Sequence, residues 1–204
     1  MTERKIVVLA SNNKGKLREF AAMFEPLHID IRPQADYGIP EAEETGLTFV
    51  ENAILKARNA CEHSGLPAMA DDSGIEVDAL QGAPGIYSAR YAGPECDDQA
   101  NNQKLVTALR DVPPLERSAR YRACLIYMRH AADPAPIIAE GVWEGRIIDD
   151  PRGKNGFGYD PYFLLPDRGI TSAELPPEEK NRISHRAIAL RILLEKIKQH
   201  DAHS

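Results

Sequence analysis

Two charged segments of this sequence have residue types and spacings that suit a phosphate-bearing ligand and a metal ion. The first is Ser11-Asn12-Asn13-Lys14-Gly15-Lys16, which follows a β-branched run and precedes a helical apolar pattern. A loop between a strand and a helix N-terminus directs backbone N–H groups at one point, and a lysine there completes a phosphate site. The segment is not a Walker A motif, because Ala10 and Leu17 replace its glycine and its metal-binding hydroxyl. A surface turn with solvated lysines is the alternative.

The second group of residues is acidic and comes from two separate segments. Glu43 and Glu44 precede a Thr-Gly pair, and Asp71-Asp72-Ser73-Gly74 interrupts an apolar run. Mg²⁺ prefers hard oxygen ligands and is usually held by one or two carboxylates together with substrate phosphates. Adjacent aspartates in an extended segment point to opposite sides, so one of them is expected to face the metal. A solvated acidic loop with an Asx turn is the alternative, and it is preferred for the glutamates taken alone.

Two further segments could bind the rest of a nucleotide. Residues 153–163 combine glycines, which allow close approach, with aromatic rings on which a planar base could stack. Lys180 and Ser184-His185-Arg186 place hydrogen-bond donors at an expected helix start, which suits an anion. Taken alone, the first is a turn with core aromatics and the second a helix cap. Together, the phosphate-binding, acidic, aromatic and second basic groups of residues predict a nucleotide bound as its metal complex.

The composition narrows the class of protein. The 25 basic and 31 acidic residues give a formal charge of −6, which argues against non-specific nucleic-acid binding. The three cysteines match neither a zinc ribbon nor a disulfide framework, so a reducing compartment, the cytoplasm, is expected. No run approaches the ~20 apolar residues of a membrane span, and no signal-peptide core follows the first residues. A small-molecule partner is therefore expected, with no nucleic acid and no membrane.

The hydrophobic pattern indicates the elements that must position these side chains. Residues 5–10 predict a buried strand, and the apolar spacing of residues 17–24 predicts a helix. Thr48 and Glu51 have the spacing of a capping box for a helix that ends near Gly65. The other expected elements are short strands at 67–70 and 75–80 separated by an acidic loop, a helix capped by Asp97 or Asp98, strands at 121–128 and 137–143, and a C-terminal helix with apolar residues from 183 to 197.

Strands and helices are interspersed, without internal repeats or a linker-like segment. This order favours a mixed α/β or α+β fold. We therefore expect one domain over residues 1–204.

The chain resembles, nearly end to end, the house-cleaning inosine/xanthosine triphosphate pyrophosphatases of the RdgB-like and Ham-like type. Long blocks in a fixed order carry the resemblance, and they are far more specific than a single short motif. The blocks are SNNKGK from Ser11, EETGLTF from Glu43, ENA from Glu51, ADDSG from Ala70, GAPGIYSARY from Gly82, GFGYDP from Gly156 and SHR from Ser184.

The resemblance implies an elongated mixed sheet with flanking helices, and two lobes around a central nucleotide-binding cleft. It implies a hydrolase, usually a homodimer, that converts dITP, ITP and XTP to the monophosphate and pyrophosphate with Mg²⁺. Such an enzyme keeps deaminated purines out of DNA and RNA.

The resemblance also implies roles for individual residues. Asp72 would be the catalytic acid/base and a metal ligand, and Glu43 or Glu44 would complete the metal site. Lys56 is a weaker candidate for phosphate stabilisation, because helix lysines are usually solvated. The implied substrate contacts are Ser11, Asn12, Asn13, Lys14, Gly15, Lys16, Ser73, Phe157, Gly158, Tyr159, Asp160, Lys180, His185 and Arg186.

Selectivity for the base would follow from hydrogen-bond polarity. Hypoxanthine and xanthine carry an acceptor oxygen at position six, whereas adenine carries a donor amine. Backbone N–H groups near Tyr159 and Asp160, with His185 and Arg186, are the expected donors. The competing hypotheses are a catalytically silent nucleotide sensor, a less selective hydrolase that releases orthophosphate, and a phosphatase of other small metabolites.

Overall fold

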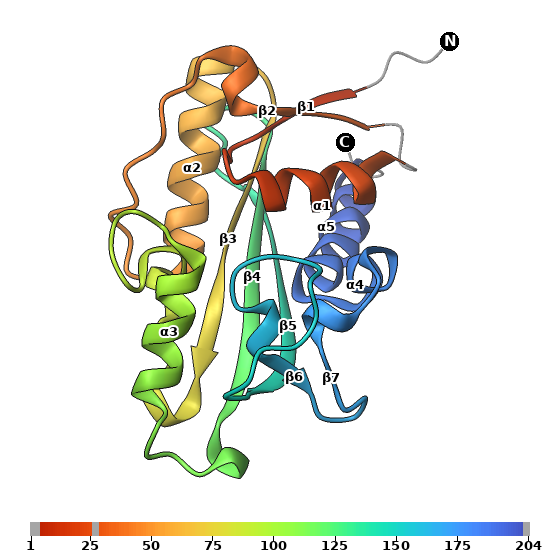
Figure 1. Ribbon diagram of the computed structural model, residues 1–204. Coiled ribbons are helices and arrows are strands. Elements are labelled where there is room, and N and C mark those ends of the chain that lie inside the picture. Colours follow the sequence, from red (N-terminus) through yellow and green to blue (C-terminus); the bar gives the residue numbers. More distant parts are fainter. Residues whose placement is uncertain (1–4, 26–28, 202–204) are drawn as a thin grey trace. The chain divides into compact units, whose positions relative to one another are not determined.

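The computed structural model describes residues 5–25 and 29–201 (Figure 1). Its sheet has the strand order β2-β1-β3-β4-β5-β6-β7 and mixes parallel with antiparallel pairs. The mixed α/β fold predicted from the sequence is thus confirmed. The strands are β1 (Lys5–Leu9), β2 (Ile29–Pro33), β3 (Ala68–Val77), β4 (Ser118–Met128), β5 (Ile137–Ile147), β6 (Phe163–Leu165) and β7 (Ile170–Thr171).

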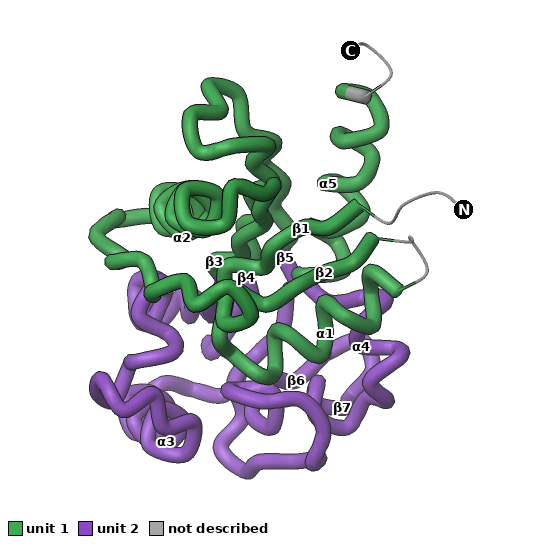
Figure 2. Tube along the Cα trace, turned by 90° about the horizontal axis from the view of Figure 1, so that it is seen from above, with its two compact units in different colours: residues 1–72, 123–141, 186–204 green, residues 73–122, 142–185 purple. Residues whose placement is uncertain are grey.

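The chain divides into two compact units (Figure 2). Unit 1 comprises residues 1–72, 123–141 and 186–204, and unit 2 comprises residues 73–122 and 142–185. Strands β3, β4 and β5 each contribute residues to both units. The hydrophobic clusters respect this division, because each consists of residues from one unit only.

Unit 1 has helices on both faces of its strands. Helices α1 (Lys14–Phe24) and α5 (His185–Asp201) lie on one face, and α2 (Phe49–Ser64) lies on the other (Figure 1). Successive strand residues point to opposite faces, so Leu9 and Met69 pack with α1 and α5, whereas Val8 and Ala70 pack with α2. The strand alternation therefore decides which helix each side chain meets.

Helix α2 begins where its capping box predicts, whereas α1 begins at Lys14, before the predicted helical pattern of residues 17–24. The Asn13 side chain accepts hydrogen bonds from the N–H groups of Gly15 and Lys16, which caps α1. Thr48 caps α2 and accepts from the Glu51 N–H. Helix α2 ends at Ser64, and its C-cap Gly65 has a φ of 68°, a left-handed conformation that glycine adopts without strain.

Unit 2 contains helices α3 (Asp98–Ala108) and α4 (Pro177–Ile183), with strands β6 and β7. Asp97 caps α3, and it is one of the two residues, Asp97 or Asp98, that the sequence predicts as the cap. The core of the unit includes Leu105 on α3 and the aromatic pair of Tyr121 and Phe163, whose ring planes are tilted by 55°. No helix within residues 5–25 and 29–201 has the length and apolarity needed to cross a membrane.

The structure corrects two sequence predictions. The expected acidic loop at residues 71–74 is wrong, because β3 runs unbroken from Ala68 to Val77. The Asp-Asp-Ser-Gly segment favours a turn in isolation, but in the extended strand Asp71 pairs with Lys16 and Asp72 pairs with Lys56. The C-terminal helical pattern from residue 183 is also interrupted: α4 ends at Ile183, and the extended Ser184 separates it from α5.

Candidate functional site

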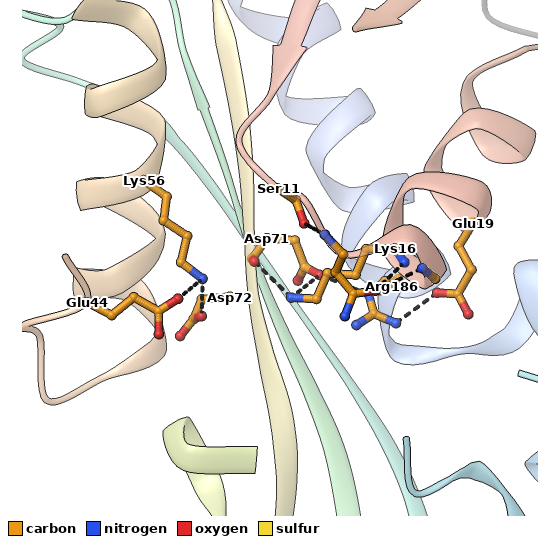
Figure 3. Close-up of polar contacts among 10 residues, drawn as sticks. Ser11, Lys16, Glu19, Glu44, Lys56, Asp71, Asp72 and Arg186 are labelled. Carbon is orange, nitrogen blue, oxygen red and sulfur yellow. Dashed lines mark hydrogen bonds and ion pairs between the residues drawn. The ribbon is translucent and has the colours of Figure 1, made fainter. Parts of the chain in front are cut away.

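Asp71 and Asp72 point to opposite sides of β3 (Figure 3). Asp71 faces helices α1 and α5, where it pairs with Lys16 and Arg186. Asp72 faces α2, where it pairs with Lys56. Strand alternation thus assigns the two neighbouring carboxylates to different partners, as the sequence predicts for an extended segment.

Asp71 is the centre of a buried ionic cluster. Its Oδ2 lies 3.0 Å from the Lys16 Nζ and 2.9 Å from the Arg186 Nε. Arg186 also pairs with Glu19, Nη1 to Oε2 at 2.8 Å. The Asp71 side chain has no exposed surface. Burial alone would raise the pKa of Asp71, but Lys16 and Arg186 lower it well below its usual range, so this carboxylate is anionic.

Lys16 is held at the start of α1 with its ammonium against β3. Its Nζ also donates to the Asp71 backbone carbonyl at 3.1 Å. Burial lowers the pKa of Lys16; Asp71 opposes this shift, while Lys56 and Arg186 add to it. Lys16, Lys56 and Arg186 therefore interact electrostatically within one unit, and each of them is paired with at least one carboxylate.

On the other face of β3, Lys56 bridges two carboxylates. Its Nζ lies 2.5 Å from the Asp72 Oδ1 and 2.8 Å from the Glu44 Oε1. The side chain is only 14% exposed, so Lys56 differs from most helix lysines, which are solvated. Lys56 follows Ala53 and precedes Ala57 on the buried stripe of α2, and this position was the signal that sequence reasoning missed.

Asp72 has the properties of a buried base. Burial raises the pKa of Asp72, and the neighbouring Lys56 and Lys16 offset this shift only in part. Its Oδ2 is buried and has no hydrogen-bond partner among the described residues. One oxygen of the carboxylate is thus committed to Lys56, and the other is available to a ligand.

The loop before α2 distinguishes Glu44 from Glu43. Glu44 pairs with Lys56, whereas the Glu43 side chain is exposed. The loop is fixed to α2 by the Gly46 N–H, which donates to the Asn52 Oδ1 at 2.8 Å. A Cβ at Gly46 would lie 2.7 Å from that same oxygen, so the close approach requires glycine.

Asp72 and Glu44 could hold a metal ion through their carboxylate oxygens. Among the described residues, no group of three or more His, Cys, Asp or Glu side chains forms a complete metal site. A hard cation can also be held by one or two carboxylates together with substrate phosphates. The unpartnered Asp72 Oδ2 and the nearby Glu44 fit such a partial site.

The remaining residues of the first segment surround the start of α1. Asn12 donates to the Glu41 carboxylate at 3.0 Å, and the Ser11 Oγ accepts from the Asn13 N–H. The N–H groups of Gly15 and Lys16 already donate to Asn13. The Lys14 side chain is exposed.

Unit 2 gathers the glycine- and aromatic-rich segment around Lys180. The Lys180 Nζ pairs with the Asp160 Oδ2 at 2.6 Å and lies 5.1 Å from the centre of the Phe157 ring. The Phe157 N–H donates to the same Asp160 carboxylate, whose other oxygen accepts from Ser172. Phe157 and Lys180 therefore form one arrangement with Asp160.

The other predicted contacts in unit 2 are more dispersed. His185 is buried and stacks on Tyr121 with a centroid separation of 4.7 Å. Tyr159 is anchored by its hydroxyl, which donates to the Ser88 carbonyl at 2.7 Å. Ser73 lies within β3 and is half-buried.

The structure also identifies residues that sequence reasoning did not select. The sequence pattern gives Asp71 no cationic partner and gives no reason to select Glu19. Glu19 follows Lys16 by three positions, so both share a face of α1. Neither pairing could be deduced from the sequence, because Arg186 is 115 positions from Asp71.

The described residues define a mixed α/β protein in which buried lysine and arginine side chains pair with carboxylates on both sides of one strand. The particular family follows from comparison with known proteins. The chain belongs to the Ham1 family, whose family model matches residues 7–196.

Curated relatives and solved structures agree with this family. A dITP/XTP pyrophosphatase of Thioalkalivibrio sulfidiphilus is 61% identical over 94% of this chain and 97% of its own length. The dITP/XTP pyrophosphatase of Escherichia coli K12 is 54% identical over 94% of this chain and 98% of its own. The HAM1 protein of Coxiella burnetii has a similar structure, with a TM-score of 0.87 and 49% identity over 96% of this chain and 99% of that one.

The Asp71 cluster makes a testable contribution to stability. Replacing Asp71 with alanine leaves Lys16 and Arg186 buried without their shared anion. Because uncompensated buried charge is costly, we expect Asp71→Ala to lower the free energy of unfolding by about 3–5 kcal/mol. Urea denaturation measures this free energy of unfolding. The exposed Asp36→Ala is the control, and its free energy of unfolding should stay within about 0.5 kcal/mol of the wild type. Equal losses in the two variants would contradict the assignment.

Proposed function

We propose that this protein is a dITP/XTP pyrophosphatase that hydrolyses non-standard purine nucleoside triphosphates to the monophosphate and pyrophosphate. The observation that carries the proposal is the arrangement around β3 in unit 1. Asp72, Lys56 and Glu44 lie on one side of the strand, and Asp71, Lys16 and Arg186 lie on the other. The names of the full-length relatives support the same activity.

Asp72 and Glu44 are the proposed ligands of Mg²⁺, with substrate phosphates completing its shell. When bound, Mg²⁺ neutralises charge on the departing pyrophosphate. The Asp72 Oδ2 supports this role, because it is buried and lacks a partner among the described residues. Glu43 is not part of the proposed site, since its side chain is exposed.

The chemical step is a displacement at the α-phosphorus. A water oxygen forms a new bond to this phosphorus, Asp72 accepts the proton of that water, and the bond to the bridging oxygen of the pyrophosphate breaks. A general base must lie within hydrogen-bond reach of the proton that it takes, and the buried Asp72 Oδ2, which has no hydrogen-bond partner among the described residues, is open to such a ligand. Lys16, Lys56 and Arg186 stabilise the negative charge that develops on the phosphates.

The base is the proposed ligand of unit 2. Phe157 offers an aromatic face, and the Tyr159 N–H and His185 are the proposed donors to the oxygen at position six of the purine. The Asp160 N–H is not proposed, because it already donates to the Phe157 carbonyl at 3.3 Å. Adenine presents an amine at that position, so the same donors would remain unpaired against ATP. The proposal places the enzyme in the cytoplasm, as its cysteine content predicts, and as a homodimer, as the resemblance implies.

A panel of nucleoside triphosphates tests this function. Purified protein is incubated with dITP, XTP, GTP and ATP, with and without Mg²⁺, and released pyrophosphate and orthophosphate are measured separately. We expect pyrophosphate from dITP and XTP, only with the metal, and at least about 100-fold lower kcat/KM for ATP. Binding without hydrolysis would indicate a nucleotide sensor. Orthophosphate as the product, or equal use of ATP, would indicate one of the less selective hydrolases.

The two glutamates give a sharp test of the metal site. Glu44→Gln removes a proposed ligand charge, so we expect the Mg²⁺ concentration for half-maximal activity to rise about tenfold or more. Glu43→Gln makes the same chemical change one residue away on an exposed side chain, and its Mg²⁺ requirement should remain within about twofold of the wild type. Similar Mg²⁺ titration curves for the two variants would rule out the assignment of Glu44.

A further inference from the structure

Gly158 is held at both its backbone groups by helix α3. Its N–H donates to the Asp98 Oδ2 at 2.8 Å. Its carbonyl accepts from the Asn102 Nδ2 at 2.9 Å. Asp98 and Asn102 are four residues apart in sequence and lie on the same face of α3. One face of this helix therefore fixes both the N–H and the carbonyl of one residue in the aromatic segment, residues 157–160.

The geometry of this contact is specific. The Asn102 Nδ2 also donates to the Asp98 carbonyl at 2.8 Å, so its amide nitrogen serves two carbonyl acceptors and must face them. Gly158 has a φ of 61°, the left-handed conformation that favours glycine. A Cβ at this position would meet no atom within 4 Å, so the glycine is required for its backbone conformation rather than for space.

The fixed residue lies between the two aromatic residues of the proposed base-binding segment. Phe157 precedes it, with its N–H bonded to Asp160, and Tyr159 follows it, with its hydroxyl bonded to Ser88. Asn101 ties α3 to the neighbouring part of the unit, because it accepts from the Ala92 N–H and donates to the Ala89 carbonyl. Helix α3 is thus anchored and can define the position of the segment.

We infer that Asp98 and Asn102 are positioning residues that hold residues 157–160 in the conformation that binds the purine base. This inference rests on the proposed function and extends it to two residues that need not touch the substrate. It assigns them to recognition of the base and not to the phosphates, because their contacts in unit 2 are to the aromatic segment.

The test compares a ligand that has a base with one that lacks it. KM and kcat are measured for dITP, and the inhibition constant is measured for inorganic tripolyphosphate, in the presence of Mg²⁺. A hydrogen bond to a charged group corresponds to about a tenfold change in binding or more. We expect Asp98→Ala to raise the KM for dITP about tenfold, with kcat and the tripolyphosphate inhibition constant within about twofold of the wild type.

Further variants separate positioning from general destabilisation. Asp98→Asn keeps an acceptor oxygen for the Gly158 N–H, so its KM should rise less than about threefold. Asn102→Asp keeps the shape but turns a donor into an acceptor facing the Gly158 carbonyl, and its KM should rise about tenfold or more. Asp111→Ala removes the same charge as Asp98→Ala from an exposed residue beyond the end of α3, and it should behave as the wild type.

The measurements distinguish failure of this inference from failure of the proposed function. An unchanged KM for dITP in Asp98→Ala and Asn102→Asp would overturn the inference, and so would parallel changes of the dITP KM and the tripolyphosphate inhibition constant. Failure of the proposed function is seen in the wild-type protein instead, which would then release no pyrophosphate from dITP. Thermal unfolding of each variant establishes that the compared proteins are folded.

Discussion

Asp72→Asn is expected to lower kcat for dITP about 10³-fold or more and, at saturating Mg²⁺, to leave nucleotide binding within about threefold of the wild type. Asparagine keeps the shape of the side chain and an oxygen that accepts from Lys56. It cannot accept a proton from the attacking water, and it loses the negative charge offered to the metal. The loss therefore concerns the transition state rather than the bound substrate.

Single-turnover kinetics and calorimetric titration with a non-hydrolysable dITP analogue measure the two quantities separately. The exposed Asp36→Asn serves as a matched control, and its kcat should equal that of the wild type. A turnover of Asp72→Asn within tenfold of the wild type would remove Asp72 from the role of general base.

Lys16→Gln is expected to have the second largest effect, a loss of about 10²–10³-fold in kcat/KM. The substitution removes a buried ammonium that faces Asp71 and is coupled electrostatically to Lys56, Arg186 and Asp72. Glutamine can still donate a hydrogen bond, but it cannot neutralise the charge that develops on the phosphates. Steady-state kinetics with dITP at saturating Mg²⁺ measures this loss.

Arg18→Gln is the matched control for this variant. Arg18 lies on the same helix and has an exposed side chain. Its substitution by glutamine removes the same positive charge. We expect its kcat/KM to stay within about twofold of the wild type. If both variants lost activity equally, the effect would reflect the net charge of α1 and not the position of Lys16.

The elements of unit 1 were largely predictable, because local chemistry specifies their ends. Thr48 and Glu51 form the cap that starts α2, and Asn13 caps α1. The strands β2, β6 and β7 were not predicted, since they have five residues or fewer and no strong periodicity. Their pairing depends on neighbours that are distant in sequence.

The candidate site was predictable in its residue types but not in its pairings. The alternation of a strand was enough to separate Asp71 from Asp72, although the segment was expected to be a loop. The ion pair between Lys56 and Asp72 was missed because a lysine on a helix is usually solvated, and only the packing of α2 against β3 buries it. Tertiary contacts, which the sequence does not display, decide these cases.

Hydrolysis of dITP in water enriched in oxygen-18 tests the central claim most directly. Mass spectrometry of both products locates the label that the attacking water contributes. If Asp72 activates a water that attacks the α-phosphorus, the label appears in dIMP and the pyrophosphate carries none. Label in the pyrophosphate, or orthophosphate as the initial product, would show that the attack occurs at a different phosphorus and would contradict the proposed site.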